Sequence, residues 1–513
     1  MMSRDLPARP RLEYLKKEAK DLLHELQRAN PKAVERLRAQ GLALTVEDTK
    51  LSSAQHTIAR EYGFASWVKL KQYVESVVRA FAPADALKAA VIAGDARRVE
   101  LLLEQHADLK ARIDNPLPDY GFGDTPLFAA VQRSNQGVID ALLRAGANIN
   151  ARTHWWAGGF GVLDDAARAD RPAWLAPYLI ERGAIVDVHA AAALGMFEKV
   201  KELVSGNPAL VHARGGDGQM PLHFAPTKEI AEYLLESGAE IDGLDIDHES
   251  TPAQYMVRDR QDVARYLLTR GCRTDILMAS ALGDLQLVRK HLEADPACLG
   301  MSVSDEYFPK NDPRAGGTIY IWALGAHKTA HIIAREFGHE DVFRVLLESS
   351  PDELKLALAC ELGEESIFKS MLANHANLVQ MLSESDRRKV SYAAQSNNTE
   401  AVRLMLAAGW PVDARGQHGA SPLHWAAFHG NTAMVQEILR YKPPLEIRDE
   451  NFGGKPLSWA IYGSVHGWNR EKGDYAGTVE ALLQAGAEPP GVSEDLEASE
   501  PVRKVLLRAT KNG

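Results

Sequence analysis

The chain has 513 residues, of which 45% are hydrophobic and 25% charged, a composition typical of folded proteins. Its formal net charge, 59 − 69 = −10, argues against a general nucleic-acid-binding protein, because such a protein needs a basic face. No apolar run approaches the ~20 residues of a membrane span. The first ten residues lack a signal-peptide core, and Cys272, Cys298 and Cys360 lack the spacing of a disulfide or metal motif. We therefore expect a cytoplasmic protein with reduced thiols, no membrane association, no metal and no other cofactor.

Residues 1–80 are predicted to form a separate helical module. Residues 11–29 carry leucines at helical spacing, Pro31 begins a second helix, and a loop over 45–49 leads to a third helix at 51–62. Ser66 is expected to cap a fourth helix that runs to about residue 79. The module holds 15 Lys and Arg against 10 Asp and Glu, so its charge is +5 and the remainder carries −10 − 5 = −15.

Two short phrases recur between residues 84 and 488. Leu-Leu-x-x-Gly-Ala occurs at 142–147, 234–239 and 482–487, and about twenty residues before such a phrase stands Pro-Leu, as in Pro126-Leu127. Proline suits the first position of a helix, a preceding Thr or Ser can cap it, and glycine suits a left-handed helix end. Each unit therefore predicts two helices. Because so small a unit cannot bury its own apolar face, the units must stack on one another.

Residues 421–431 and 330–342 follow the pattern Thr-Pro-Leu-His … Gly-His/Asn, and on these motifs the sequence resembles the ankyrin-repeat family. The resemblance implies an all-α solenoid of about twelve repeats over 84–488, with a terminal half-repeat and with 489–513 as a C-terminal capping helix and tail. Residues 54–67 resemble a helical module that heads many bacterial ankyrin-type proteins. That likeness implies a bacterial source and a capping role for residues 1–80, with docking through its basic face as the alternative.

Three of the loops between repeats, the fingers, are long, near 110–124, 153–162 and 301–326. A fourth long insertion, near 462–476, lies inside the last full repeat, within helix-forming sequence. They combine glycine with aromatic and charged residues, which is typical of a recognition surface. The alternative is that each finger packs its own aromatic rings as a small satellite core. The candidate binding residues are Tyr120, Phe122, His154, Trp155, Trp156, Phe160, Tyr307, Phe308, Lys310, Arg314, Trp322, Trp425, His429, His466 and Trp468.

Other histidines and acidic residues receive structural interpretations. His223, His331 and His424 begin first helices, where the ring is expected to hydrogen-bond neighbouring backbone. His327 lies four residues before His331, but no His-Glu-x-x-His motif is present, so no metal site is predicted. The acidic finger at 245–249 lacks the spacing of a calcium loop and is expected to be solvated.

For function, the ankyrin resemblance implies a monomeric scaffold whose concave finger and helix face binds a protein or peptide, and not nucleic acid. The alternative is an enzyme or small-ligand binder, for a sugar or planar metabolite, with a pocket formed by the long fingers. In that case Asp305, Glu306, His154 and His466 would carry acid–base roles. The sequence has no phosphate-binding loop and no nucleophile elbow, which favours binding over catalysis. The two hypotheses differ on whether the long fingers converge.

Overall fold

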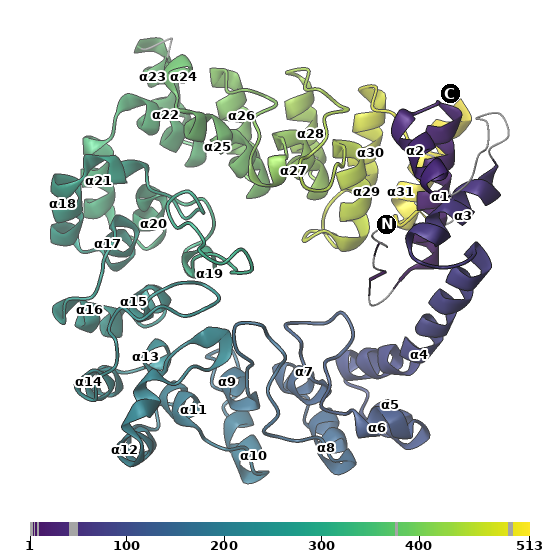
Figure 1. Cartoon of the computed structure of the whole chain (residues 1–513). Coiled ribbons are helices and arrows are strands. Elements are labelled where there is room, and N and C mark those ends of the chain that lie inside the picture. The colour runs from purple at the N-terminus through teal and green to yellow at the C-terminus, as the bar shows by residue number, and fades with distance from the viewer. Residues whose placement is uncertain are drawn as a thin grey trace. The chain divides into compact units, whose positions relative to one another are not determined.

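The computed structural model describes residues 4, 6, 7, 10–40, 50–374, 378–490 and 496–512. The chain divides into two compact units, residues 1–247 and 248–513, and both are built of helices (Figure 1). Among the described residues the extended pairing is limited to one antiparallel bridge, between Ser302 and Thr329. No helix in these ranges has the length and apolar character to cross a membrane. The loop expected at 45–49 lies outside the described residues.

The first unit opens with the predicted helical module. Its helices are α1 (Leu12–Gln27), α2 (Pro31–Ala39), α3 (Leu51–Glu61) and the first part of α4 (Trp67–Ala93). The Ser66 hydroxyl accepts a hydrogen bond from the amide of Lys69, as the capping prediction requires. The end expected near residue 79 is wrong, because α4 accommodates Pro83 and continues to Ala93, where Gly94 takes φ +73°. The second half of α4 thereby becomes the first helix of the repeats.

The module has a core of its own, distinct from that of the repeats, in which leucines of α1 pack against Ile58 of α3. At its edge, Arg36 donates two hydrogen bonds to Glu61, with Nε–Oε1 and Nη2–Oε2 distances of 2.9 and 2.8 Å. Arg4 pairs with both Glu61 and Glu18. The hydrogen bond to Glu61 raises the pKa of Arg36, although burial opposes it. One carboxylate thus joins the N-terminal segment to α2 and α3.

Glu61→Gln should destabilise the module by about 1–3 kcal/mol, because it removes one of the two carboxylates that Arg4 and Arg36 share, Glu18 being the other. Hydrogen exchange of the α1–α3 amides measures the effect. Glu13→Gln is the matched control, since the side chain of Glu13 is 58% exposed and pairs with Lys16 at 3.6 Å. It should change stability by less than about 0.5 kcal/mol. Equal effects of the two substitutions would contradict this account.

The repeats of the first unit form two layers of helices, visible in Figure 1. After α4, the inner layer consists of α7 (Pro126–Gln132), α9 (Val162–Ala166), α11 (Val188–Ala193) and α13 (Pro221–Phe224). The outer helices are α5 (Ala96–Gln105), α6 (Ala107–Ala111), α8 (Gln136–Ala145), α10 (Leu175–Glu181), α12 (Phe197–Gly206) and α14 (Lys228–Glu236), with 3₁₀ turns η2 (Pro208–His212) and η3 (Gly216–Gly218).

The second unit repeats this arrangement. Its inner helices are α15 (Pro252–Met256), α17 (Ile276–Leu282), α20 (Ala330–Glu336), α22 (Asp352–Glu361), α25 (Glu384–Gln395), α27 (Pro422–Phe428) and α29 (Pro456–His466). The outer helices are α16 (Gln261–Thr269), α18 (Leu285–Ala294), α21 (Glu340–Ser349), α23 (Glu365–Asn374), α26 (Thr399–Ala408), α28 (Thr432–Leu439) and α30 (Tyr475–Gln484). Short helices and 3₁₀ turns between them are η4 (Pro296–Gly300), α19 (Tyr320–Ala323), α24 (Leu378–Met381) and η5 (Gln417–Gly419), and α31 (Glu500–Asn512) follows α30.

The local signals in the sequence act as predicted. Pro126 begins α7, and the Thr125 hydroxyl accepts a hydrogen bond from the amide of Phe128 at 3.2 Å. Gly146 ends α8 at φ +101°, a conformation that glycine adopts without steric cost. Alanines of the inner helices, such as Ala129 and Ala426, are fully buried, so neighbouring helices can approach closely. On α31, Val502 and Leu506 are buried and extend the core of the second unit as a terminal helix.

Candidate functional site

Neighbouring fingers are tied together through their backbones. In the first unit, the amide of His154 donates to the carbonyl of Gly123 at 2.9 Å, and the amide of Asp217 donates to Gly158 at 3.2 Å. In the second unit, the amide of Glu450 donates to the carbonyl of His418 at 2.9 Å. Successive fingers therefore form a continuous surface within each unit, and side chains on adjacent fingers are held at fixed separations.

An arginine inside each of two fingers supports this surface, a feature that the sequence analysis missed. Arg214 Nη1 donates to the carbonyls of Gly218 and Leu244, at 2.6 and 2.8 Å. Arg415 Nη1 donates in the same way to Gly419 and Arg448, at 2.6 and 2.7 Å. Each arginine thus binds its own finger and the next one. The repeated motif Arg-Gly-x-x-Gly, at 214–218 and 415–419, is the signal that could have revealed them.

The first two long fingers meet within the first unit. The rings of Phe122 and Trp155 lie edge to face with centroids 4.7 Å apart, and Trp155 contacts Trp156 at 6.3 Å. Phe160 packs against Phe128 of α7 at 6.4 Å and joins the repeat core. Phe122, at 52% exposed, remains available to a partner. The rings therefore mostly contact one another, as the satellite-core alternative predicts.

The other candidates on these fingers lie at their edges. His154 is exposed, and Tyr120 is half-buried with the guanidinium of Arg133 5.3 Å from its ring centroid.

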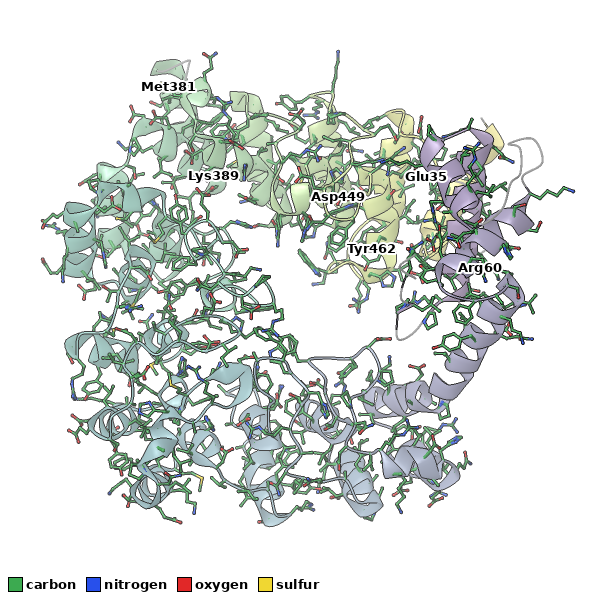
Figure 2. All side chains as sticks on the ribbon, viewed as in Figure 1. Glu35, Arg60, Met381, Lys389, Asp449 and Tyr462 are labelled. Atoms are coloured by element: carbon green, nitrogen blue, oxygen red, sulfur yellow. The ribbon has the colours of Figure 1, made fainter. Side chains whose placement is uncertain are left out.

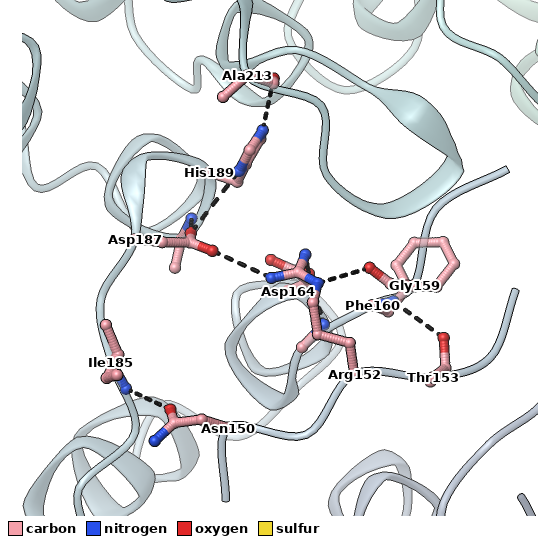
Figure 3. Close-up of polar contacts among 12 residues, drawn as sticks. Asn150, Arg152, Thr153, Gly159, Phe160, Asp164, Ile185, Asp187, His189 and Ala213 are labelled. Carbon is pink, nitrogen blue, oxygen red and sulfur yellow. Dashed lines mark hydrogen bonds and ion pairs between the residues drawn. The ribbon is translucent and has the colours of Figure 1, made fainter. Parts of the chain in front are cut away.

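Arg152 organises the second finger, as Figure 3 shows. Its Nε donates to the carbonyl of Gly159 at 2.8 Å, its Nη2 to Asp164 at 2.9 Å and its Nη1 to Asp187 at 3.1 Å. The buried Asp164 carboxylate also accepts from the amide of Gly161 at 2.7 Å. Burial raises the pKa of Asp164, and Arg152 opposes that effect. The network fixes the finger against α9 and α11, which is a structural role.

Arg152→Gln should therefore loosen the finger, because Asp164 loses its cation while remaining buried. We expect a loss of about 1–3 kcal/mol, measured by hydrogen exchange of residues 150–165. Arg168→Gln is the control, because Arg168 and Asp170 form an exposed pair, with 62% and 58% side-chain exposure. Equal changes in the hydrogen exchange of residues 150–165 in the two variants would contradict the assigned role of Arg152.

Asp124 is the buried acid of the first finger, with 1% of its surface exposed. Its Oδ1 has no hydrogen-bond partner in the described part of the chain. Burial raises the pKa of Asp124 to about 6, and a hydrogen bond from the amide of Phe122 only partly opposes this. The ionised side chain consequently destabilises the folded state at pH 7.

The sign of this effect gives a test. The folded protein holds the Asp124 proton more tightly than the unfolded chain, so its contribution to stability is most unfavourable above pH 6 and improves as pH falls from 6 towards 4. Asp124→Asn should raise the Tm at pH 7.5, and its advantage over wild type should shrink as the pH falls. Asp119→Asn, in the same finger but exposed, controls for loss of a charge. A pH-independent difference for Asp124→Asn would refute the assignment.

The third long finger, in the second unit, is held by Glu249. This carboxylate accepts hydrogen bonds from the amides of Asn311 and Asp312, at 2.8 and 2.9 Å. Phe308 packs edge to face on the buried Tyr320, with centroids 5.4 Å apart, and Tyr307 is half-buried. The finger thus folds back on its own aromatic rings.

The polar candidates of this finger are exposed. Arg314 pairs with its neighbour Asp312, and Lys310 lies 3.8 Å from Asp305. Asp305 and Glu306 are both exposed, and Glu306 accepts from the hydroxyl of Ser385 at 3.2 Å. Trp322, on α19, is 71% exposed.

The histidine predictions hold. His223 Nδ1 lies 3.2 Å from the amide of Met220, and His424 Nδ1 lies 3.1 Å from the amide of Ser421, as predicted. His331 hydrogen-bonds the backbone of Leu346, and its Nε2 also bonds the side-chain hydroxyl of Ser350 at 2.8 Å. Burial lowers the pKa of His331 to about 4, so it is neutral at pH 7. His327 stacks on Tyr392, with centroids 3.8 Å apart.

The expectation of a solvated acidic finger at 245–249 is wrong. Asp245 and Asp247 are 3% and 5% exposed. The amides of Ile246 and Asp247 donate to the carbonyl of Asp217 on the preceding finger, at 2.9 and 3.1 Å. This pairing holds the segment against its neighbour and buries its acidic side chains.

Two consecutive repeats of the second unit carry rings at the same three positions. Their inner helices, α27 and α29, begin with Pro422 and Pro456. Counted from that proline, the positions are four residues before it, three after it and six after it. Because α27 and α29 pack side by side, equivalent rings become neighbours (Figure 1). The rings are His418, Trp425 and Phe428 in the first repeat and Phe452, Trp459 and Tyr462 in the second.

These six rings and Trp468 line a cavity of about 460 Å³, which we call the aromatic pocket. The floor is formed by Trp425 and Trp459, 2% and 9% exposed, whose rings lie edge to face 5.0 Å apart. The mouth is formed by Phe452, Tyr462 and Trp468, which are 71%, 56% and 69% exposed. Large rings that stay exposed beside buried ones are what a binding site for an apolar group requires.

A buried carboxylate stands behind the pocket wall. Asp449 lies on the finger before α29, and Tyr462 lies on α29 itself (Figure 2). Asp449 Oδ2 accepts from the indole Nε1 of Trp459 at 3.0 Å and from the amide of Gly454 at 2.7 Å, while Oδ1 accepts from Phe452 at 2.6 Å. Burial acts to raise the pKa of Asp449, but these hydrogen bonds outweigh it and lower the pKa. The carboxylate is therefore ionised at pH 7.

The fourth long insertion begins as helix, in keeping with its helix-forming sequence, since α29 continues to His466 before the chain turns at Gly467. Trp468 consequently stacks over Trp425, with centroids 6.0 Å apart. His466 is outside the pocket lining and pairs with Glu497 at 3.2 Å. His429 is buried, and its Nε2 bonds the carbonyl of Gln395 at 2.8 Å, which gives it a packing role.

Trp425 and Trp468 were among the candidate binding residues, whereas His418, Phe428, Phe452, Trp459 and Tyr462 of the pocket were not. The signal was present, because both repeats read Pro-Leu-x-Trp-Ala-x-aromatic.

The fold and this surface define a class of protein, an all-helical solenoid with projecting fingers. A family model for ankyrin repeats, in three copies, matches residues 188–278 and 390–490, and a single ankyrin-repeat model matches 122–154. These matches identify ankyrin repeats within residues 122–154, 188–278 and 390–490, and a helical module precedes them in the chain. Ankyrin repeats are generally scaffolds for protein interaction. The match at 390–490 contains the whole aromatic pocket.

Proposed function

We propose that this protein binds a segment of a partner protein on the finger and inner-helix face of its second unit, with the aromatic pocket as the anchoring point. The observation that carries the proposal is the exposure of Phe452, Tyr462 and Trp468 around a cavity whose floor is buried Trp425. Tryptophan and tyrosine dominate the binding energy of protein interfaces, because they bury a large area at small entropic cost.

The first two long fingers support a wider contact surface in this proposal, because Phe122 presents an exposed ring on the first unit. The buried, free thiols of Cys272, Cys298 and Cys360 suit a reducing compartment, and burial raises the pKa of Cys298 to about 11. A cytoplasmic, monomeric protein of bacterial origin, as the likeness of residues 54–67 implies, is part of the same proposal.

Selection of peptides from a random displayed library tests the proposal. Peptides enriched on the wild-type protein should lose at least about tenfold in affinity on Trp468→Ala or Phe452→Ala, because each substitution removes one wall of the pocket. Trp322→Ala is the matched control, since Trp322 is 71% exposed and Trp468 69%. Affinities come from fluorescence anisotropy, with circular dichroism as the check on folding. Enriched peptides that were insensitive to Trp468→Ala and Phe452→Ala would contradict the proposal.

A further inference from the structure

The lining of the aromatic pocket contains no formally charged side chain, yet the pocket is backed by a negative charge. Asp449 is ionised, 3% exposed and in direct hydrogen-bond contact with the indole of Trp459. An indole whose N–H donates to a carboxylate presents a more negative ring face. The faces of tryptophan, phenylalanine and tyrosine all attract cations, and tryptophan does so most strongly.

Two arginines near the pocket, Arg415 and Arg448, form hydrogen bonds with backbone carbonyls. Arg415 donates to the carbonyls of Gly419 and Arg448, and Arg448 Nη1 donates to that of Gly453 at 2.6 Å. Neither guanidinium lines the pocket. His424 hydrogen-bonds Gly454 from below the wall, and burial lowers its pKa to about 4, so it is neutral at pH 7. The Asp449 carboxylate, in contrast, is ionised and contacts a lining ring directly, through the indole of Trp459.

The pocket lining is mostly aromatic, and its side-chain hydroxyls are those of Ser458 and Tyr462. The Asp449 carboxylate already accepts hydrogen bonds from the amides of Phe452 and Gly454 and from the indole N–H of Trp459. The carbonyl of Gly454 already forms a hydrogen bond with Nε2 of His424. An unmodified lysine brings three N–H donors and an arginine brings five, and burying them without acceptors is costly. A quaternary ammonium group carries the same charge, has no N–H donor and presents methyl groups that pack against rings.

We propose that the aromatic pocket binds the quaternary ammonium group of a trimethylated lysine side chain on the partner protein. This inference rests on the proposed function and names the group that the anchoring point recognises. The rings supply complementary shape and charge. Trp425 and Trp459 meet at an interplanar angle of 85°, and Phe428 meets Trp468 at 86°, so the rings that line the cavity differ in orientation. Asp449 supplies the fixed negative charge behind them.

Three peptides that differ in one group test the proposal. Each is acetyl-Gly-Ala-X-Ala-Gly-amide, where X is trimethylated lysine, unmodified lysine or the neutral tert-butyl analogue of trimethylated lysine. Titration into the full-length protein, followed by tryptophan fluorescence, gives the dissociation constants. We expect the trimethylated peptide to bind at least about tenfold more tightly than either of the others, because a desolvated cation–π contact favours it over the uncharged isostere.

Three variants locate the effect. Trp468→Ala should abolish the preference for the trimethylated peptide, whereas Trp322→Ala should leave it unchanged. Asp449→Asn should weaken the trimethylated peptide more than the neutral analogue, because only the cation senses the lost charge. A general disturbance of the finger would weaken both peptides equally, and that result would remove Asp449 from the account.

The outcomes separate this inference from the proposed function. Equal or tighter binding of the neutral analogue would overturn the cation preference and leave an apolar anchoring pocket. Library peptides that bind through an uncharged side chain would lead to the same conclusion. If free choline bound as tightly as the trimethylated peptide, a modified lysine would be overturned as the source of the quaternary ammonium group, and the pocket would be a small-molecule site. No binding of any of the three peptides would overturn the inference itself.

Discussion

The close approach of neighbouring inner helices is the constraint on which the rest of this structure depends. A helix pair of this size cannot bury its apolar face alone, so each pair must pack on the next. Fully buried alanines such as Ala426 and Ala460 leave room for that packing. The backbone bond from Glu450 to His418, and the arginine that spans the same two fingers, then set neighbouring fingers in register. A side chain at one repeat position is thereby placed beside its equivalent in the next repeat.

Because of this register, residues at equivalent positions of two repeats lie together and form the aromatic pocket. A single tryptophan at the third position after the helix-starting proline would be one more buried ring. Two such residues in consecutive repeats, Trp425 and Trp459, make a floor, and the finger rings above them make walls. In the first unit the finger rings of Phe122, Trp155 and Trp156 contact one another instead. The same geometry therefore supports a satellite core in one unit and a cavity in the other.

Much of the fold could be predicted from the sequence because its signals are local. Proline at a helix start, a threonine cap and a glycine helix end act within a few residues, and Thr125, Pro126 and Gly146 behave accordingly. The end of α4 was missed because a single proline inside a helix does not always terminate it. The burial of Asp245 and Asp247 was missed because it depends on backbone pairing with another finger.

The site was predicted only in part, for a related reason. Trp425 and Trp468 were among the predicted binding residues. Phe452 and Trp459 were not, because the prediction concentrated on the long fingers and these two residues lie in a repeat of ordinary length. Their importance appears only when two repeats are aligned by the helix-starting proline. Asp449 could not be assigned from the sequence, because its role depends on three hydrogen bonds that form in the folded finger.

The most direct test is a ¹H–¹⁵N spectrum of the indole groups of all nine tryptophans, recorded while tetramethylammonium chloride is added at constant ionic strength. The account predicts that the indole signals of Trp425, Trp459 and Trp468 shift with a saturating curve. Those of Trp155 and Trp322 should stay unchanged, and sodium chloride should not reproduce the shifts. Signals that failed to move, or that moved equally across all the tryptophans, would contradict the claim that aligned repeats form one cation-selective aromatic site.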